Sequence, residues 1–256
     1  MPVPLRERFY PPNMASATGI PENNELLHDE PTEEEPLLGH AGDASQKPSR
    51  PLYQNLYLGT GFIAQAGIIL LVALTWANVF LTPLIFFSPH PLLNTAGLLF
   101  FTESILLLQP THTAPQKRTG TLAHTSLNVL ALSLLIAGLV IIEVNKFAHN
   151  GTHFESPHAI LGLLTYIALI FQSAVGVAQY FVPSVFGSED KAKSIYKYHR
   201  WAGYAVLALM FGTVNAATQT TYNLTTLHIE WKAILLATIL VILGVAPRIH
   251  KQKLGL

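Results

Sequence analysis

The sequence predicts an all-α integral membrane protein with six transmembrane helices. Of its 256 residues, 50% are hydrophobic and 12% are charged, and the mean hydropathy is +0.37. This composition is typical of membrane proteins. Uncharged runs of about 20 residues, long enough to cross a hydrocarbon core, recur along the chain. The sequence contains no cysteine, which excludes disulfides, iron–sulfur clusters and thiolate-bound metal centres.

Residues 1–52 differ in kind and are predicted to form a disordered cytosolic tail. Nine prolines and nine acidic residues precede Leu52, with little apolar periodicity. No apolar core follows the start, so a signal peptide is not expected. The stretches "ENNELL" (22–27) and "EEEPLL" (33–38) resemble acidic dileucine sorting signals, which favours a vacuolar, endosomal or other endomembrane location over the plasma membrane. The alternative is an ordinary acidic linker.

Residues 53–248 are predicted to form one six-span domain, followed by a short cytosolic tail over residues 249–256. The first uncharged stretch ends at Glu103, and Pro83, Pro89 and Pro91 divide it into two helices. The predicted spans cover residues 57–81, 90–108, 122–142, 156–182, 198–218 and 232–248.

The distribution of basic residues predicts that both ends of the chain are cytosolic. With this orientation, thirteen of the fifteen lysines and arginines fall on the cytosolic side, and only Lys146 and Lys232 fall opposite. Two N-glycosylation acceptor motifs, "NGT" at Asn150 and "NLT" at Asn223, then both lie in lumenal loops.

A histidine opens each of four consecutive predicted spans: His90, His124, His158 and His199. Because consecutive spans run in opposite directions, His90 and His158 lie near the lumenal face. His124 and His199 lie near the cytosolic face. The topology therefore sorts the four histidines into two pairs, one on each side of the membrane. A single such histidine is as readily an interfacial residue bonded to a carbonyl or a lipid headgroup.

Two imidazoles that face each other from two helices are what a six-coordinate haem iron requires. The sequence therefore predicts a central four-helix bundle with two b-type haems. Gly162 and Gly203 each follow a histidine by one helical turn and leave room for a flat macrocycle, although small residues also serve helix packing. Zinc or copper fits less well, because zinc takes at least three protein ligands. The remaining histidines are expected in the tails and solvated loops: His28, His40, His112, His149, His153, His228 and His250.

The stretches "HPLLNTAGLLFFTESILLL", "SPHAILG" and "YHRWAGY" resemble the cytochrome b561 family, and more closely its six-span domain-containing branch. The resemblance covers roughly residues 60–245. It implies that His90 and His158 bind a lumenal haem and that His124 and His199 bind a cytosolic one, with no catalytic residue beyond the haems. It also implies that electrons cross from a cytosolic, ascorbate-like reductant to a lumenal or extracellular acceptor, monodehydroascorbate or ferric iron.

The chain departs from the ascorbate-using members at several positions. It resembles them in Lys117, seven residues before His124, but has Thr121 where they often have a second lysine. Their arginine at the end of the second span is absent from "LLLQPTH". A basic cluster at the cytosolic mouth is still predicted to attract an anionic reductant, or else to serve orientation and haem propionates. Its members are Lys117, Arg118, Lys197 and Arg200.

Glu103 is the one acidic residue within a predicted span and lies in the cytosolic half of its helix. We expect it to form a structural ion pair with Arg200. The alternatives are contact with a haem propionate and a part in proton transfer.

Three classes of function remain open from the sequence. A transmembrane electron-transfer oxidoreductase needs a small diffusible reductant or another protein as its electron donor, because the chain has no dinucleotide-binding fingerprint. A six-helix transporter is a second possibility, but the predicted spans lack the Gly- or Pro-broken helices that transporters have in matching halves. A haem-free membrane scaffold has only the long tail in its favour. The lipid bilayer is a partner in every case, and a basic face that would bind nucleic acid is not found. The sequence leaves open whether two copies form a homodimer.

Overall fold

A computed structural model describes residues 44–47 and 50–255, which form six long helices joined by short helical turns and loops, without strands in these residues. The elements are η1 (Leu52–Leu56), α1 (Gly61–Phe80), α2 (Pro89–Leu108), α3 (Ala114–Ala148), α4 (Pro157–Phe181), η2 (Pro183–Phe186), α5 (Glu189–Ala217), η3 (Asn223–Leu227), α6 (Trp231–Val245), η4 (Ala246–Arg248) and η5 (Lys251–Leu254). The predicted all-α fold is therefore confirmed.

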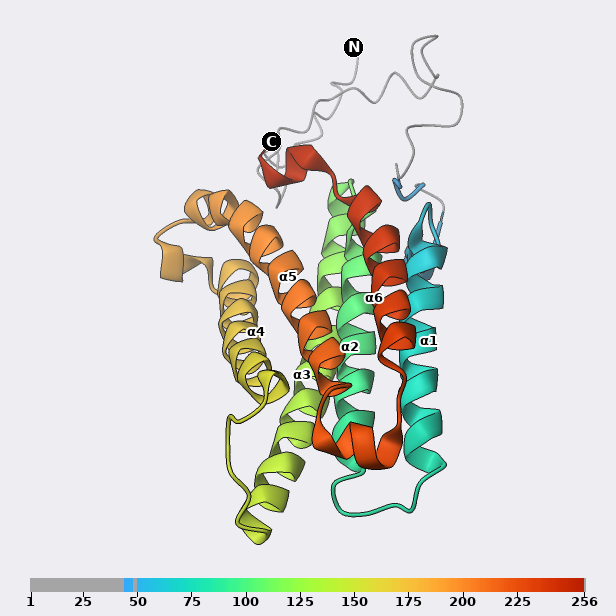
Figure 1. Cartoon of the computed structure of the whole chain (residues 1–256). Coiled ribbons are helices and arrows are strands. Elements are labelled where there is room, and N and C mark those ends of the chain that lie inside the picture. The colour runs from blue at the N-terminus through green and yellow to red at the C-terminus, as the bar shows by residue number, and fades with distance from the viewer. Residues whose placement is uncertain (1–43, 48–49, 256) are drawn as a thin grey trace, which may run out of the picture.

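The helices run up and down as one bundle (Figure 1). Helix α2 packs on α3, α4 packs on α5, and α1 packs on both α6 and α2. Both ends of the described chain lie on one side of the bundle, at the top of Figure 1. We call it the termini side and the other the opposite side. The termini side is the predicted cytosolic side.

Five helices are long and apolar enough to cross a membrane: α1, α2, α3, α4 and the segment Trp231–Arg248. The remaining predicted span, residues 198–218, lies in the second part of α5. This helix begins earlier, at Glu189, with a charged first turn in which Ser188 caps the helix by accepting a hydrogen bond from Lys191 N. Helix α5, whose first turn carries Glu189 and Asp190, is not among these five segments.

Helix α3 is longer than its predicted span of residues 122–142. It has 35 residues and begins with a capping box, in which Thr113 and Gln116 bond to each other's backbone. At 1.5 Å per residue it is about 50 Å long, more than the thickness of the hydrocarbon core. Its ends therefore extend into the aqueous boundary on both sides.

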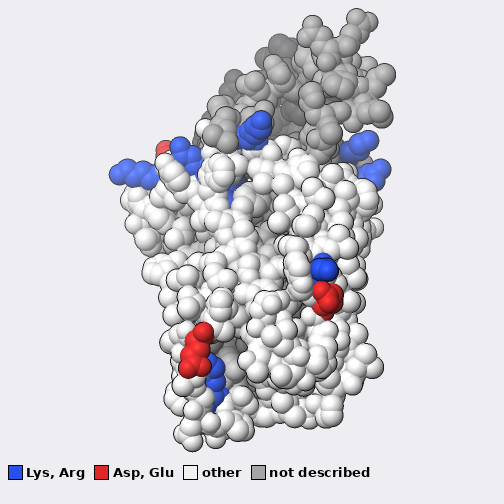
Figure 2. Space-filling model, viewed as in Figure 1, with Lys and Arg blue, Asp and Glu red and all other residues white. Residues whose placement is uncertain are grey.

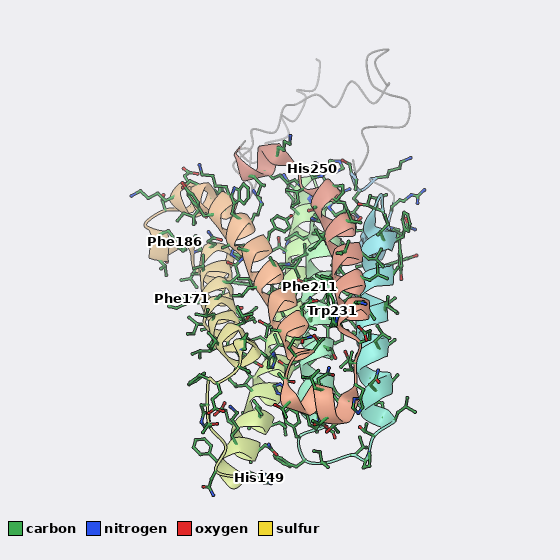
Figure 3. The ribbon with its side chains drawn as sticks, viewed as in Figure 1. His149, Phe171, Phe186, Phe211, Trp231 and His250 are labelled. Atoms are coloured by element: carbon green, nitrogen blue, oxygen red, sulfur yellow. The ribbon has the colours of Figure 1, made fainter. Side chains whose placement is uncertain are left out.

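The outer surface of the bundle suits contact with lipid. The space-filling view shows a broad white face with basic side chains gathered at the termini side (Figure 2). Phe171 is 68% exposed on the outer side of α4, whereas Phe211 of α5 is only 2% exposed in the core (Figure 3). Glycines bring α1 and α6 together inside the bundle: a Cβ atom at Gly67 would lie 2.6 Å from the carbonyl oxygen of Ala237.

The N-terminal tail predicted for residues 1–52 lies mostly outside the described residues, as do both dileucine-like stretches, His28 and His40. The described part packs against the bundle. Ala44 and Gln46 are buried, and Gln46 N donates to Pro110 O over 3.0 Å. The packed chain thus begins before the predicted boundary at residue 52.

Candidate functional site

His90 and His158 face each other on the opposite side of the bundle. Each follows a Ser-Pro pair, and the proline occupies the first position of α2 or α4, where its missing N–H costs no hydrogen bond. Each histidine is therefore the second residue of its helix. The two ring centroids lie 6.2 Å apart at an interplanar angle of 89°. Two imidazole nitrogens that bind one metal ion at about 2 Å each would place the ring centres roughly 6 Å apart.

The second ring nitrogen of three histidines is held by a carbonyl of the neighbouring helix. Nδ1 of His90 lies 2.8 Å from Gly138 O, Nδ1 of His158 lies 2.9 Å from Thr213 O, and Nδ1 of His124 lies 3.1 Å from Ser104 O. A carbonyl can only accept, so each Nδ1 carries the proton and donates it. Each Nε2 is left unprotonated, as a metal ligand requires, and the contact fixes the ring orientation.

His124 and His199 lie on the termini side and line the same cavity, which has a volume of about 320 Å³. Each lies ten positions after the first residue of its helix, because α3 and α5 begin before the predicted spans. The ring of His199 is placed differently from the others. Its Nε2 lies 3.4 Å from Gln172 Nε2, and its buried Nδ1 has no hydrogen-bond partner.

The two pairs occupy two levels of the bundle. Fourteen residues separate His90 from Ser104 on α2, and fourteen separate His124 from Gly138 on α3. The same spacing separates His158 from Gln172 on α4 and His199 from Thr213 on α5. At 1.5 Å per residue, the two levels are about 21 Å apart along the helices. The structure thus brings each predicted pair together, one on each side.

The surroundings of the histidines fit a flat group held between them. A Cβ atom at Gly162 would meet only Thr213 Cγ2, at 3.8 Å, so the protein's own atoms do not fill this space. The space beside Gly203 is bounded by Gln172 Nε2, 3.1 Å from where its Cβ would be. In addition, His199, whose buried Nδ1 has no hydrogen-bond partner, lines a cavity together with apolar residues such as Phe101, Val129 and Leu132. These residues fit two bis-imidazole haem sites.

The alternative of a zinc or copper site receives no support. The described residues contain no group of three or more histidine, aspartate or glutamate side chains that could hold a metal ion. Each histidine pair therefore offers only the two imidazoles that haem iron requires.

Two of the four predicted substrate residues line the termini-side cavity, namely Lys117 and Arg200. Arg118 and Lys197 are exposed and do not line it. Lys197 instead lies over the ring of Tyr198, with Nζ 5.1 Å from the ring centroid.

Arg248, at the end of the last predicted span, also lines this cavity, and so do His250 and Lys253 of the predicted C-terminal tail. His250 lies beside the turn after α6 on the termini side, and His149 lies far away at the other end of α3 (Figure 3). The pattern "PRIHKQK" indicated only positive charge on the cytosolic side, because a basic end looks the same whether it folds back on the bundle or not.

The predicted ion pair between Glu103 and Arg200 is wrong. Glu103 Oε2 accepts a hydrogen bond from Gln65 Nε2 over 2.7 Å, and Arg248 is the arginine that interacts with it electrostatically. Arg200 donates instead from Nη1 to Lys253 O over 2.6 Å. Arg248 and Lys253, the partners of Glu103 and Arg200, both belong to the segment after α6. Their positions depend on how this segment folds back, which the order of residues in the sequence does not reveal.

The second predicted glycan acceptor, Asn223, lies in a buried position. Asn223 is 5% exposed, and its Nδ2, the atom that would carry the sugar, donates to Thr218 O and Ile229 O. Its Oδ1 accepts from Ile229 N, so the side chain holds the loop before α6 together. Asn150 is exposed, with a positive φ of 50°, and stays a predicted acceptor.

Among the loop histidines, His153 has a specific partner. Its Nε2 lies 2.9 Å from Glu143 Oε2, which makes an ion pair when the ring is protonated. His112 and His149 are exposed, as expected of loop residues.

The comparisons with known proteins agree with this geometry. The family model for eukaryotic cytochrome b561 matches residues 89–227, more than half of the chain, and the matched segment contains all four paired histidines. The chain belongs to the cytochrome b561 family. A transmembrane ascorbate-dependent reductase of Sus scrofa, CYB561, is 29% identical over 128 residues, and the protein of the same name from Homo sapiens is 27% identical over 128 residues. The aligned region spans about half of this chain and half of these relatives.

Membership in this family of membrane cytochromes, together with the candidate spans, makes the chain a multi-pass membrane protein. Helices α2 to α5 fall in the matched segment, whereas α1, α6 and the C-terminal turns lie outside it.

Proposed function

We propose that this protein is a transmembrane oxidoreductase that moves electrons between two b-type haem sites, one near each membrane face. The observation that carries the proposal is the pairing of four histidines from four helices at two levels of one bundle. His90 and His158 hold one haem, and His124 and His199 hold the other. In this arrangement the bound haem iron supplies the one-electron chemistry at each level.

The chain's own residues would orient the ligands and exclude water. The carbonyls of Gly138, Ser104 and Thr213 accept the Nδ1 protons and fix three imidazoles in one tautomer. Between the two levels, Tyr166 of α4 reaches Leu135 O of α3 over 2.7 Å and ties the helices together. Buried apolar side chains such as Leu135 and Leu169 would keep water out of the bundle between the two levels.

An anionic, ascorbate-like compound is the proposed reductant. The lining of the termini-side cavity includes the basic side chains of Lys117 and Arg200, and no aspartate or glutamate is among its described residues. Such a cavity attracts anions. The exposed Arg118 and Lys197 would add to this attraction from outside. The names of the two relatives support ascorbate, and monodehydroascorbate or ferric iron on the opposite side is the proposed acceptor.

In the proposed orientation the protein lies in an endomembrane, such as that of vacuoles or endosomes, and its termini side faces the cytosol. The positive charge on this side supports it. Residues 1–52 would be its cytosolic tail, 53–248 the membrane domain and 249–256 the second tail. A homodimer is compatible with the exposed apolar helix faces.

A reduced-minus-oxidised absorption spectrum of the purified protein tests this function. Wild type should contain two b-type haems per chain, and His90→Ala or His158→Ala should remove one of them. His124→Ala or His199→Ala should remove the other. His149→Ala, in an exposed loop, is the matched control and should keep both.

Proteoliposomes loaded with ascorbate then test the direction. Wild type should reduce an impermeant ferric complex outside the vesicles, and each of the four alanine variants should not. A colourless wild-type protein, or unchanged haem content in all four variants, would overturn the proposal.

A further inference from the structure

Amide side chains hold the backbone beside the paired histidines of α2 and α3. On α2, Asn94 Nδ2 donates to His90 O over 2.8 Å. On α3, Asn128 Nδ2 donates to His124 O over 2.7 Å. Each asparagine follows its histidine by four residues, so it reaches back over one turn of its own helix. Both histidines are therefore supported from within the helix that carries them.

On α5 the same hydrogen bond comes from a different helix. The residue four positions after His199 is Gly203, which has no side chain to reach back. Gln172 of α4 takes its place, because its Nε2 donates to His199 O over 2.7 Å. A Cβ atom at Gly203 would lie 3.1 Å from that Nε2, which is tighter than ordinary contact. The space beside Gly203 is thus the space that the Gln172 amide occupies.

The same amide also contacts the ring of His199. The bond to His199 O shows which amide atom is the nitrogen, and this nitrogen lies 3.4 Å from Nε2 of the ring. An amide nitrogen can only donate, so the ring Nε2 that it faces is unprotonated. At His90, His124 and His158 a carbonyl at Nδ1 selects this tautomer. Gln172 selects the same tautomer through the other ring nitrogen.

The place of Gln172 in the bundle matches that of the residues that hold the other rings. Ser104, Gly138 and Thr213 each lie fourteen residues after the histidine of their own helix, and each bonds the histidine of the neighbouring helix. Gln172 lies fourteen residues after His158. It performs with its side chain what the other three perform with their backbone carbonyls.

A glycine one turn further along α4 completes the support. A Cβ atom at Gly176 would lie 2.8 Å from Cε1 of His199, so the ring packs on the bare backbone there. Gln172 and Gly176 are four residues apart and share one face of α4. Helix α4 therefore sets the position of His199, although α5 carries it.

We propose that Gln172 is the positioning residue for His199, and that Gly203 is small in order to admit its amide. Gln172 acts through the carbonyl and the ring of His199, as groups behind metal ligands do. This gives Gly203 a role other than making room for a macrocycle. The haem readouts of the test below rest on the proposed function, whereas its unfolding readout does not.

The experiment uses the purified full-length protein in detergent and compares wild type with Gln172→Leu. Gln179→Leu is the matched control. Gln179 is a second glutamine of α4 that lines the same cavity, and its buried amide has no hydrogen-bond partner within the described part of the chain. Two quantities are measured for each haem level. The low-spin EPR g values report the angle between the two imidazole planes, and the rate of haem transfer to apomyoglobin reports the strength of binding.

Gln172→Leu should shift the g values of the His124–His199 haem and speed its transfer about tenfold, within the range found for groups behind metal ligands. The His90–His158 haem should keep its wild-type values, and so should both haems in Gln179→Leu. A glutamine that only filled space between α4 and α5 would leave the g values unchanged, because leucine fills a similar volume.

A second pair of variants tests the role of Gly203. Gly203→Asn alone should loosen the same haem, because the new side chain meets the Gln172 amide. In the double variant, Gln172→Ala with Gly203→Asn, that space is free. The introduced asparagine then follows His199 by four residues, as Asn94 and Asn128 follow their histidines. The double variant should therefore recover the wild-type g values and bind this haem more tightly than Gly203→Asn does.

The proposal is overturned if Gln172→Leu matches Gln179→Leu in both quantities at the His124–His199 level. It is also overturned if the double variant binds this haem no better than Gly203→Asn, since Gly203 would then make room for the macrocycle. Should Gly203→Asn fail to fold, the comparison of Gln172→Leu with Gln179→Leu decides alone.

A wild type without haem would overturn the proposed function instead. Thermal unfolding of Gln172→Ala, Gly203→Asn and the double variant then decides the inference. A double variant that loses less stability than the sum of the two single losses supports the contact between the amide and Gly203, and additive losses overturn it.

Discussion

The hydroxyl of Tyr166 lies 2.9 Å from Oδ1 of Asn94, which joins α4 to the helix that carries His90. Asn94 in turn donates from Nδ2 to His90 O over 2.8 Å. A residue of the bundle interior thus supports the start of α2, where a haem ligand is proposed. Partners behind metal ligands of this kind set ligand orientation and affinity.

Tyr166→Phe should therefore weaken haem binding at the His90–His158 level. We expect an affinity loss of about tenfold at that site, within the range found for groups behind metal ligands. Haem transfer to apomyoglobin measures this loss. The haem at the His124–His199 level is the internal control and should transfer at the wild-type rate. Equal loss from both sites would show that the tyrosine serves overall stability instead.

The sequence was sufficient to predict which histidines pair, because both the spacing and the alternation of helix direction are local properties of the chain. His90 lies with His158 as predicted from topology. The length of α3 was not predictable from hydropathy, because Lys146 lies on the same continuous helix after the apolar run has ended. A capping box at its start carries the helix past the membrane boundary there.

The sequence could not predict the partners of Glu103 and Arg200, because these depend on where the segment after α6 folds. Lys253 reaches the loop between α2 and α3 across more than 140 positions of the chain. The ring placement of His199 beside Gln172 was equally hidden, since an amide at that position looks like an ordinary polar residue in a helix. The positions of the basic residues predict a side of the membrane, but they do not predict these contacts.

Two glycines beside the paired histidines should respond differently to replacement by alanine. A Cβ atom at Gly176 would lie 2.8 Å from Cε1 of His199, too close for the ring to keep its place. Gly176→Ala should therefore remove the haem at the His124–His199 level. At Gly162 the nearest protein atom would be 3.8 Å away, so Gly162→Ala should fold normally.

The prediction for Gly162→Ala concerns the haem at the His90–His158 level. If a macrocycle lies in the open space beside Gly162, the added methyl group should lower the content of that haem while circular dichroism of the apoprotein stays at the wild-type value. The pyridine haemochrome assay gives the haem content. Full content of both haems in Gly162→Ala and Gly176→Ala would place the haems elsewhere.

The two acceptor motifs should differ in expressing cells. Asn150→Gln should increase gel mobility if Asn150 carries a glycan, because the residue is exposed. Asn223→Gln should leave mobility unchanged and lower the stability of the protein, because loss of a buried, bonded amide costs about 1–3 kcal/mol. Thermal unfolding measures the second effect. A mobility increase on Asn223→Gln would show that the loop before α6 opens during synthesis.

The attachment of the C-terminal turn should depend on pH. Burial, with the nearby cations Arg200 and Lys117, lowers the pKa of Lys253 to about 7. A lysine whose pKa is lowered on docking holds its proton more tightly when the turn is detached. Docking should thus strengthen as the pH rises from about 7 toward the ordinary lysine pKa of about 10.4, and it should be weakest below pH 7.

A spin label on an introduced cysteine measures this attachment, because the chain has no cysteine of its own. With Lys251→Cys carrying the label, mobility should be higher at pH 6 than at pH 9. The second variant, Lys253→Met in the same labelled protein, should flatten this dependence because the titrating ammonium is gone. His250 also lines the cavity and carries a titratable imidazole. A pH dependence that persists in Lys253→Met would assign the switch to His250, and label mobility that falls with decreasing pH would contradict the charge-burial argument itself.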